Sequence, residues 1–492
     1  MYARQLDPAE DLSGLADALI SGNQAVLALA NCYQLCRFNF HILRDARLTE
    51  SPWANDYARL RREFYDLLQK KRVPGRALAQ SEMGSISEKL RFSSLPEALV
   101  CCAALLKALS LYIAEEQAWL TGFEQLTVRS SPAFGAKEFI LTPDAASAIA
   151  ERVPHEHLPR LDEQISETLA CYHRGLRITP VEVDAWRLRR CALPSTTDSL
   201  LRLRVNRGPM KIAMTPLTHD ANLKGRPASG FPDDEPDRFL IESVGDEEPQ
   251  IRLLAEILEQ CHREGISILV LPELRMPRNL LRTVVEFLQR QSCDLDRGLL
   301  LVVAGSWHVE DQTTGSWVNR SVVLDCRGDV IWTHDKLAEY NITPENVAAN
   351  PALKKQLGIS DRGAREYIQP GTVLQFCDSA LGRLSVAICV GFFHQPLMQL
   401  LIESGANVFF VPAMTPRVKD IDQCAWSLVR SQHASTFVAN CGAVALKKEQ
   451  TGGIEEEVSA CFYRTPAADR AVSMRCPTIT GDHLHVFNLN NI

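Results

Sequence analysis

The chain has 492 residues, of which 46% are hydrophobic and 23% are charged, and its formal net charge is −7. A chain of this length is expected to form two or three domains, each large enough to bury a hydrophobic core. The mildly acidic charge gives the whole protein no electrostatic attraction to nucleic acid or to an anionic membrane surface. We therefore do not expect nucleic acid as a partner.

The fifteen cysteines are scattered along the chain. They form no CxxC pair and no Cys/His cluster at zinc spacing, so no metal is predicted. Glycine-rich phosphate-binding signatures are also missing, so no nucleotide cofactor is predicted. Isolated thiols of this kind are typical of a reducing compartment, which predicts a cytoplasmic protein. The opening residues "MYARQLDPAEDLSG" lack the basic and apolar regions of a signal peptide.

One apolar stretch, "ALVCCAALLKALSLYIA", is a candidate for a membrane span. It contains Lys107 and is shorter than the roughly 20 apolar residues that a span needs. We interpret it as a buried helix of a protein that does not enter a membrane.

Residues 1–207 are predicted to form an all-helical N-terminal domain of unknown role, because apolar residues recur there at helical spacing. The basic segments 187–190 and 200–207 are interpreted as a solvent-exposed helix face and linker. The helix-start signals are Asp11, Ser94 with Glu97, Thr142 with Pro143, and Thr179 with Glu182.

Residues 208–492 show a different pattern, in which short apolar strands alternate with amphipathic helices. Buried strands such as "ISILVL", "LLLVVAG" and "ANVFFVP" indicate an α/β or α+β domain with well-covered sheets. Two further strands flank the turn "CRGD", which predicts a β-hairpin.

Three chemically versatile residues follow apolar strands in this region: Glu273, Lys336 and Cys389. Each has an ordinary structural interpretation, as a helix cap, a surface lysine and a core thiol. Together they have the composition of a catalytic site. A carboxylate can take the proton of a thiol, and an ammonium can stabilise the oxyanion formed when the thiolate attacks a carbonyl. The backbone N–H of Val390 is a natural second oxyanion donor.

Several segments, in this order, resemble the nitrilase or carbon–nitrogen hydrolase superfamily: "KIAMTPL", "GISILVLPEL", "LLLVVAGSWH", "WVNRSVVLDCRGDVIWTHDKL", "REYIQPG", "GRLSVAIC", "SGANVFFVPA" and "WSLVRSQHASTFVANCGAV". The resemblance covers nearly all of residues 210–492. It implies a four-layer αββα sandwich with Glu273 as general base, Lys336 as oxyanion-stabilising lysine and Cys389 as nucleophile.

The resemblance also implies a second glutamate that orients the lysine. Glu366, in "EYIQPG", matches best, with Glu345 and Glu339 as rivals, because the stretch from Lys336 to Gly371 is longer than usual in the family. That longer stretch is expected to line or cover the pocket.

The sequence departs from the family pattern at several positions. Val390 and Gly391 stand where an aromatic and then an acidic residue are common, and His433 stands where glutamate is usual. These departures argue against any well-known subfamily. His394, five residues after Cys389, also permits a Cys–His protease, although no third, orienting group is evident.

The sequence therefore predicts a hydrolase of non-peptide C–N bonds that acts on a small amide, carbamoyl compound or nitrile through a thioester. The alternative is a catalytically degenerate sensor or scaffold whose helical domain binds a protein partner. The resemblance also implies a homo-oligomer.

Overall fold

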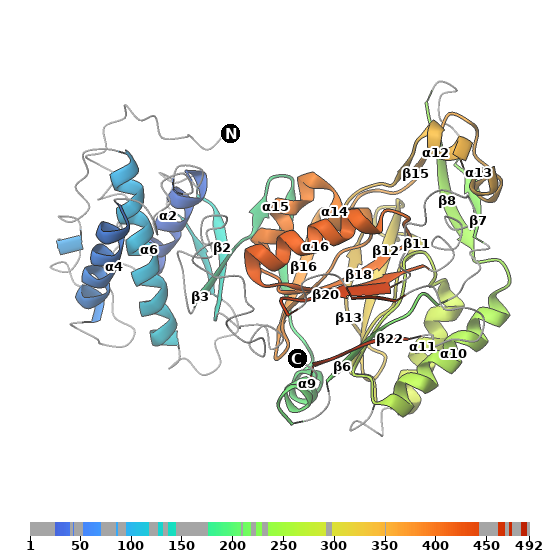
Figure 1. Ribbon diagram of the computed structural model, residues 1–492, viewed down its shortest axis with the longest axis horizontal. Coiled ribbons are helices and arrows are strands. Elements are labelled where there is room, and N and C mark those ends of the chain that lie inside the picture. The colour runs from blue at the N-terminus through green and yellow to red at the C-terminus, as the bar shows by residue number, and fades with distance from the viewer. Residues whose placement is uncertain are drawn as a thin grey trace. The chain divides into compact units, whose positions relative to one another are not determined.

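The computed structural model describes sixteen stretches of the chain, which divide into two compact units, one ending at residue 184 and the other beginning at 185. Figure 1 shows their helices and strands. The described stretches are 25–39, 43, 53–69, 85–86, 95–117, 126–130, 136–143, 176–207, 210–217, 223–228, 235–291, 298–349, 351–441, 461–467, 472–474 and 484–489. The helix predicted after Asp11 lies outside them.

The first unit combines helices with a small antiparallel sheet of order β1-β2-β3. Its elements are α2 (Ala25–Phe38), α4 (Trp53–Gln69), α6 (Leu95–Gln117), β1 (Leu126–Arg129), β2 (Glu138–Pro143) and β3 (Leu176–Pro180). Phe64 of α4, Leu109 of α6 and Phe139 of β2 belong to one buried cluster. The helices and the sheet therefore share a hydrophobic core.

The apolar stretch tested as a membrane span forms most of α6. Within the described residues, Pro96–Ile113 is long and apolar enough to cross a membrane, but 78% of that window is buried inside the structure. A core helix has the same length and composition, and the burial agrees with the predicted buried helix.

The expectation that residues 1–207 are all-helical is not confirmed, because five strands lie in that range. Two apparent helix starts are strand ends: Thr142-Pro143 closes β2, and Thr179-Pro180 closes β3. Threonine favours strands because of its β-branched side chain, and proline is tolerated at strand ends, so the same residues fit either structure. The predicted boundary at 207/208 lies inside the second unit.

The second unit contains two large mixed sheets. The first has the order β11-β12-β10-β9-β6-β22, with β13 paired to β12. Its strands are β6 (Lys211–Met214), β9 (Ile268–Val270), β10 (Leu301–Val303), β11 (Trp307–Glu310), β12 (Trp317–Asp325), β13 (Val330–Asp335) and β22 (His485–Asn488). The predicted hairpin around "CRGD" is the antiparallel pair β12–β13.

The second sheet follows the order β21-β20-β19-β18-β17-β16-β5. Its strands are β5 (Trp186–Cys191), β16 (Val373–Ser379), β17 (Gly382–Val386), β18 (Val408–Ala413), β19 (Ser435–Asn440), β20 (Cys461–Arg464) and β21 (Val472–Met474). The short β4 (Glu182–Val183) precedes β5 in the chain. The basic segment 187–190 is thus part of a strand, which corrects its interpretation as a helix face and linker.

The two sheets pack face to face, with helices on their outer faces (Figure 1). Ile212 and Val303 of the first sheet share a buried core with Phe410 of the second. Helices α10 (Glu247–Glu264) and α11 (Arg278–Gln291) pack their apolar side chains on the first sheet. Helices α14 (Val390–Phe393), α15 (Gln395–Glu403) and α16 (Val418–Gln432) lie with the second sheet, and α9 (Ser195–Arg207) adds to the inter-sheet core.

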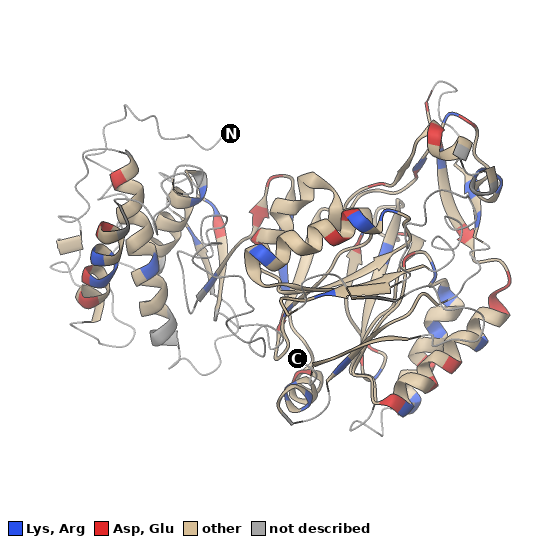
Figure 2. Ribbon diagram, viewed as in Figure 1, with Lys and Arg blue, Asp and Glu red and all other residues tan. Residues whose placement is uncertain are grey.

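Helices α10 and α11 carry both acidic and basic residues, as Figure 2 shows. Arg252 pairs with Glu248, and Arg282 pairs with Glu286, each one helical turn apart. With apolar residues on one side and charges on the other, these helices have the amphipathic pattern of a covering layer.

A third, four-stranded sheet of order β14-β15-β8-β7 is built partly from the long stretch after Lys336. Its elements are β7 (Lys224–Pro227), β8 (Asp237–Ser243), β14 (Asn341–Ile342) and β15 (Ala364–Glu366), with helices α12 (Pro344–Ala349) and α13 (Pro351–Leu357) between the last two strands. Phe239, Ile342 and Leu357 belong to its own hydrophobic cluster. We call this the added sheet.

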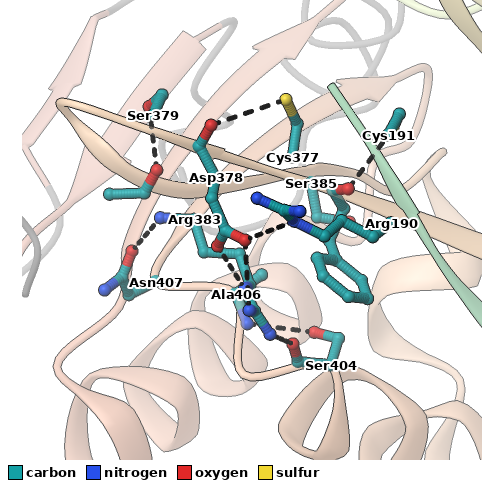
Figure 3. A network of polar contacts seen from close by, with 12 residues as sticks. Arg190, Cys191, Cys377, Asp378, Ser379, Arg383, Ser385, Ser404, Ala406 and Asn407 are labelled. Atoms are coloured by element: carbon teal, nitrogen blue, oxygen red, sulfur yellow. Dashed lines mark hydrogen bonds and ion pairs between the residues drawn. The ribbon is translucent and has the colours of Figure 1, made fainter. Parts of the chain in front are cut away.

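The carboxylate of Asp378, on β16, joins arginines from two other strands of the second large sheet, Arg190 on β5 and Arg383 on β17 (Figure 3). The Asp378 carboxylate bonds Arg190 Nε at 2.9 Å and Arg383 Nε at 2.7 Å. Arg383 also donates to the Ser404 carbonyl at 3.0 Å and lies 4.1 Å from the centroid of the Phe376 ring. The fully buried guanidinium of Arg383, on β17, thus links its own strand and β16 to the turn after α15.

Replacing Arg383 with alanine should lower the free energy of unfolding by about 3–5 kcal/mol, because it removes one partner of a buried ion pair. The matched control is Arg226→Ala, which breaks an exposed pair with Glu242 and should cost less than about 1 kcal/mol. Urea denaturation of both variants measures the difference. Equal losses would contradict the structural role assigned to Arg383.

Candidate active site

The structure brings together the four acidic, basic and thiol side chains that the sequence singled out. Glu273 follows β9, Lys336 follows β13, Glu366 ends β15, and Cys389 follows β17. Each is at most 2% exposed. Three of them leave strands of the two large sheets, and the added sheet supplies Glu366.

Strained or tightly packed backbone shapes the loops that carry these residues. Cys389 has φ 45° and ψ −112°, and Leu274, next to Glu273, has φ 54°. Positive φ in a residue other than glycine is costly and is often found at functional sites. Gly305 has φ 55°, and a Cβ there would lie 2.2 Å from the Pro272 carbonyl oxygen. Only glycine fits beside the loop that presents Glu273.

Lys336 lies between two buried carboxylates. Its Nζ is 2.8 Å from Glu273 Oε1 and 2.6 Å from Glu366 Oε2. Burial opposes the charge of the ammonium, but the charges of Glu273 and Glu366 outweigh that penalty and raise the pKa of Lys336. The two carboxylates therefore favour the ammonium form of Lys336 in this site.

Glu366 accepts four hydrogen bonds. His308 Nε2 and Asn319 Nδ2 each lie 2.9 Å from its Oε1. Lys336 Nζ and the Tyr340 N–H, the latter at 3.0 Å, bond its Oε2. Burial would raise the pKa of Glu366, but the charge of Lys336 and the bond from His308 lower it well below its usual range. The carboxylate is ionised, and each of its two oxygens accepts two hydrogen bonds.

The rivals of Glu366 do not contact Lys336 in this way. Glu339 pairs with Arg238 and Arg365 at 3.6 and 3.5 Å. Glu345 is exposed on α12. The structure thus places only Glu366 of the three on the lysine.

The Cys389 thiol is protonated at rest. Burial raises its pKa well above the ordinary value, and the nearby charge of Glu273 raises it further, while Lys336 opposes the shift. A hydrogen bond between the thiol and Glu273 contributes to the same effect. Since Glu273 contacts both the thiol and the lysine, it is placed to receive the thiol proton.

The backbone after Cys389 leaves one N–H available. The N–H groups of Gly391 and Phe392 donate to the carbonyls of Ile388 and Cys389. The N–H of Val390 makes no hydrogen bond to any residue in the described part of the chain. An N–H without a protein acceptor is what the predicted oxyanion donor requires.

The structure shows the surroundings of Gly391, His394 and His433, and they differ from one residue to the next. A Cβ on Gly391 would meet Leu337 at ordinary contact distance, 3.7 Å from its nitrogen, so close packing does not require glycine there. His394 is exposed whereas Cys389 is buried, which disfavours a Cys–His pair. His433 ends α16 in the left-handed conformation with φ 52°, and burial lowers its pKa.

Sequence reasoning missed three residues of this cluster. Asn319 Nδ2 bridges Glu273 and Glu366, and His308 bonds Glu366. Tyr340 lies with its ring centroid 5.9 Å from Lys336 Nζ, and burial raises its pKa. A buried asparagine within the apolar strand "WVNRSVVLD" was the one available signal.

The added sheet covers this cluster. Its hydrophobic core includes Leu274, the neighbour of Glu273, and Tyr340 and Met414 pack against it. The predicted covering by the long stretch after Lys336 therefore has a physical counterpart.

A separate cavity of about 320 Å³ lies in the first unit. It is lined by Asp56, Arg59, Leu60, Glu63, Glu97, Val100 and Cys101. None of its lining residues belongs to the cluster.

The described residues contain no group of three or more His, Cys, Asp or Glu side chains arranged to hold a metal ion. The cysteines that the structure describes are all free thiols.

No protein-family model matches the sequence, and a comparison with curated proteins also finds no match. Solved structures that resemble this chain over 57% of its length include Saccharomyces cerevisiae Nit3, a member of branch 10 of the nitrilase superfamily, at 14% identity, 90% coverage of Nit3 and a TM-score of 0.37. The NitN amidase of Nesterenkonia sp. AN1 matches at 16% identity, 91% of its length and a TM-score of 0.36. The glutamine-dependent NAD+ synthetase of Acinetobacter baumannii matches at 13% identity, 45% of its length and a TM-score of 0.36.

Nitrilase-superfamily members are thus among the solved structures that this chain resembles. These identities and TM-scores are too low to support an activity.

Replacing Lys336 with methionine should invert the pH dependence of stability. In the wild type, the lowered pKa of Glu366 contributes stability above its ordinary pKa of 4.5, and this is lost as pH falls towards the folded-state value. Without the lysine, the two buried carboxylates repel each other, the pKa of Glu366 rises, and stability should increase as pH falls from about 7.5 to about 5.

The variant should also lose about 3–5 kcal/mol of unfolding free energy near neutral pH, because unpaired charges stay buried. Urea denaturation across this pH range is the measurement. Lys354→Met, which removes an exposed pair with Asp361, is the matched control and should leave the pH profile unchanged. An unchanged profile in Lys336→Met would contradict the proposed charge balance.

Proposed function

We propose that the protein hydrolyses a non-peptide C–N bond of a small amide or carbamoyl compound through a thioester on Cys389. The observation that carries this proposal is the buried ammonium of Lys336 held between two carboxylates, one of which also bonds the thiol. Burying such charges is expensive and contributes little to stability, which favours a catalytic reason for them.

In the proposed acylation step, Glu273 takes the proton of the Cys389 thiol and the sulfur attacks the carbonyl carbon. The oxyanion that develops is stabilised by Lys336 Nζ and the Val390 N–H. When the tetrahedral intermediate collapses, the C–N bond breaks. Glu273 returns the proton to the leaving nitrogen, which departs as ammonia or an amine.

In the deacylation step, Glu273 accepts a proton from water, and the resulting nucleophile attacks the thioester carbonyl. The same two donors stabilise the second oxyanion. Collapse releases the carboxylic acid, and the proton on Glu273 restores the thiol. One carboxylate therefore serves as base and acid in both halves of the reaction.

The raised pKa of Lys336 determines which residue of the cluster can act as the general base. A lysine that stays protonated cannot act as the general base, so this role falls to Glu273. Glu366, with four hydrogen bonds, is saturated and serves to hold the ammonium. This assigns to Glu366 the part of the second, lysine-orienting glutamate.

A second candidate function is a non-hydrolytic sensor or scaffold, favoured by the 1% exposure of Cys389. In that case no substrate reaches the thiol. The complete set of polar contacts around Lys336 favours the enzyme, because a degenerate site has no need to keep each of them. Homo-oligomer formation, a protein partner of the first unit and a cytoplasmic location stay predictions from the sequence.

The decisive experiment incubates the full chain with a panel of short aliphatic amides, carbamoyl compounds and nitriles. It follows product release together with intact protein mass. We expect turnover of at least one compound and a transient acyl adduct that maps to Cys389. Cys389→Ala should abolish both, whereas Cys326→Ala, which removes another buried thiol, should abolish neither. Full activity of Cys389→Ala would exclude the proposed nucleophile, and no turnover or adduct with any compound would favour the scaffold.

Replacing Glu273 with glutamine should lower kcat/KM by about 10²–10⁴-fold, the usual contribution of a general acid–base. Glutamine keeps the shape of the side chain but cannot take the thiol proton. Steady-state kinetics on the best substrate of the panel measures this loss. A loss below tenfold would mean that another group activates the thiol.

A further inference from the structure

His308 on β11 is buried, and both of its ring nitrogens have a partner. The Ile241 N–H, on β8 of the added sheet, lies 2.8 Å from Nδ1, and Glu366 Oε1 lies 2.9 Å from Nε2. The imidazole side chain is 0% exposed. It therefore bridges a backbone group of the added sheet and the carboxylate that holds Lys336.

These two partners determine where the imidazole proton lies. The Ile241 N–H can only donate, so Nδ1 must offer its lone pair and carries no proton. The ring proton is then on Nε2 and points at Glu366 Oε1. His308 is thus a neutral imidazole fixed in one tautomer, which donates to a carboxylate and cannot exchange that role with its other nitrogen.

We propose that His308 is a positioning residue for the hydrolysis, which orients Glu366 so that Glu366 keeps Lys336 at the oxyanion. This inference rests on the proposed function. His308 does not touch the reacting atoms and acts through two intervening side chains.

The hydrogen bonds of Glu366 show why His308 matters for orientation. Its Oε1 is held by His308 and Asn319, which leaves Oε2 to Lys336 and the Tyr340 N–H. Asn319 shares its Nδ2 with Glu273, so it can follow either carboxylate. Of the two side chains on Oε1, His308 is the one bound to Glu366 but not to Glu273. Without it, the carboxyl group can rotate and the lysine loses its fixed partner.

The same bond gives the added sheet a mechanical connection to the site. Glu366 ends β15, which pairs with β8 in parallel register, and Ile241 lies on β8. His308 fastens β8 to β11 of the first large sheet through the Ile241 N–H. The added sheet thereby braces Lys336 as well as covering the cluster.

His334 offers a matched comparison. It is also buried, lies two residues before Lys336, and its ring nitrogens make no hydrogen bond to any residue that the structure describes. His308→Phe and His334→Phe are the same chemical change at similar burial. Only the first removes a donor from Glu366.

The first test measures the tautomer of His308 in the wild-type protein by ¹⁵N–¹H NMR of labelled histidines, with His308→Gln identifying the His308 signals. We expect a proton on Nε2 and a bare Nδ1. A proton on Nδ1 would overturn the proposal, because the ring could then not both accept from Ile241 and donate to Glu366. This readout needs no substrate, no enzymatic activity and no folded phenylalanine variant.

The second test compares His308→Phe, His308→Gln and His334→Phe. We expect His308→Phe to lower kcat by about 10–100-fold with little change in KM, as is typical when a group that orients a catalytic ligand is removed. His308→Gln should restore most of the loss, because one amide offers both an acceptor for Ile241 and a donor for Glu366. His334→Phe should retain most of kcat.

Equal losses in the two phenylalanine variants, or no rescue by glutamine, would overturn the positioning role. The rate of Cys389 alkylation by iodoacetamide, followed by peptide mass, is measured on the same variants. It should fall in His308→Phe and not in His334→Phe. If the wild type hydrolyses no compound of the panel, the proposed hydrolysis fails, while the tautomer and alkylation measurements still decide whether His308 orients the cluster.

Discussion

The second unit depends on one charge balance: the Lys336 ammonium bonded to Glu273 and Glu366 at 2.8 and 2.6 Å. All three groups are out of water, so each charge would be costly to bury without its partners. The balance also needs three separate parts of the chain to meet, since the groups follow β9, β13 and β15. A change in the position of any of these strands would therefore leave a buried charge without its partner.

Much of this unit could be predicted from sequence, because its strands are short apolar runs that end at polar residues. Glu273, Lys336 and Cys389 were found in this way, and all three belong to the buried cluster. His308 could not be found, since its role depends on the Ile241 N–H of a distant strand. Glu366 had two rivals because distance along the chain does not show which carboxylate reaches the lysine.

The first unit was predicted less well, for a specific reason. Thr142-Pro143 and Thr179-Pro180 have the composition of a helix start, yet both close strands that pair with each other. Whether such a segment forms a helix or a strand depends on its pairing with a distant part of the chain, which the local sequence does not show. The helix α6 did not have this ambiguity, because its apolar window of 18 residues is too long for an ordinary strand.

The position of β5 in the second sheet limits where a fragment of this protein can begin. Strand β5 runs parallel to β16, and its Arg190 bonds Asp378. A fragment that starts at residue 208 would lose this strand and expose the backbone edge of β16, a template for pairing with other chains. The fold of the second unit therefore begins upstream of its first recognisable motif, and the shortest fragment that keeps β5 in the second sheet includes Trp186–Cys191.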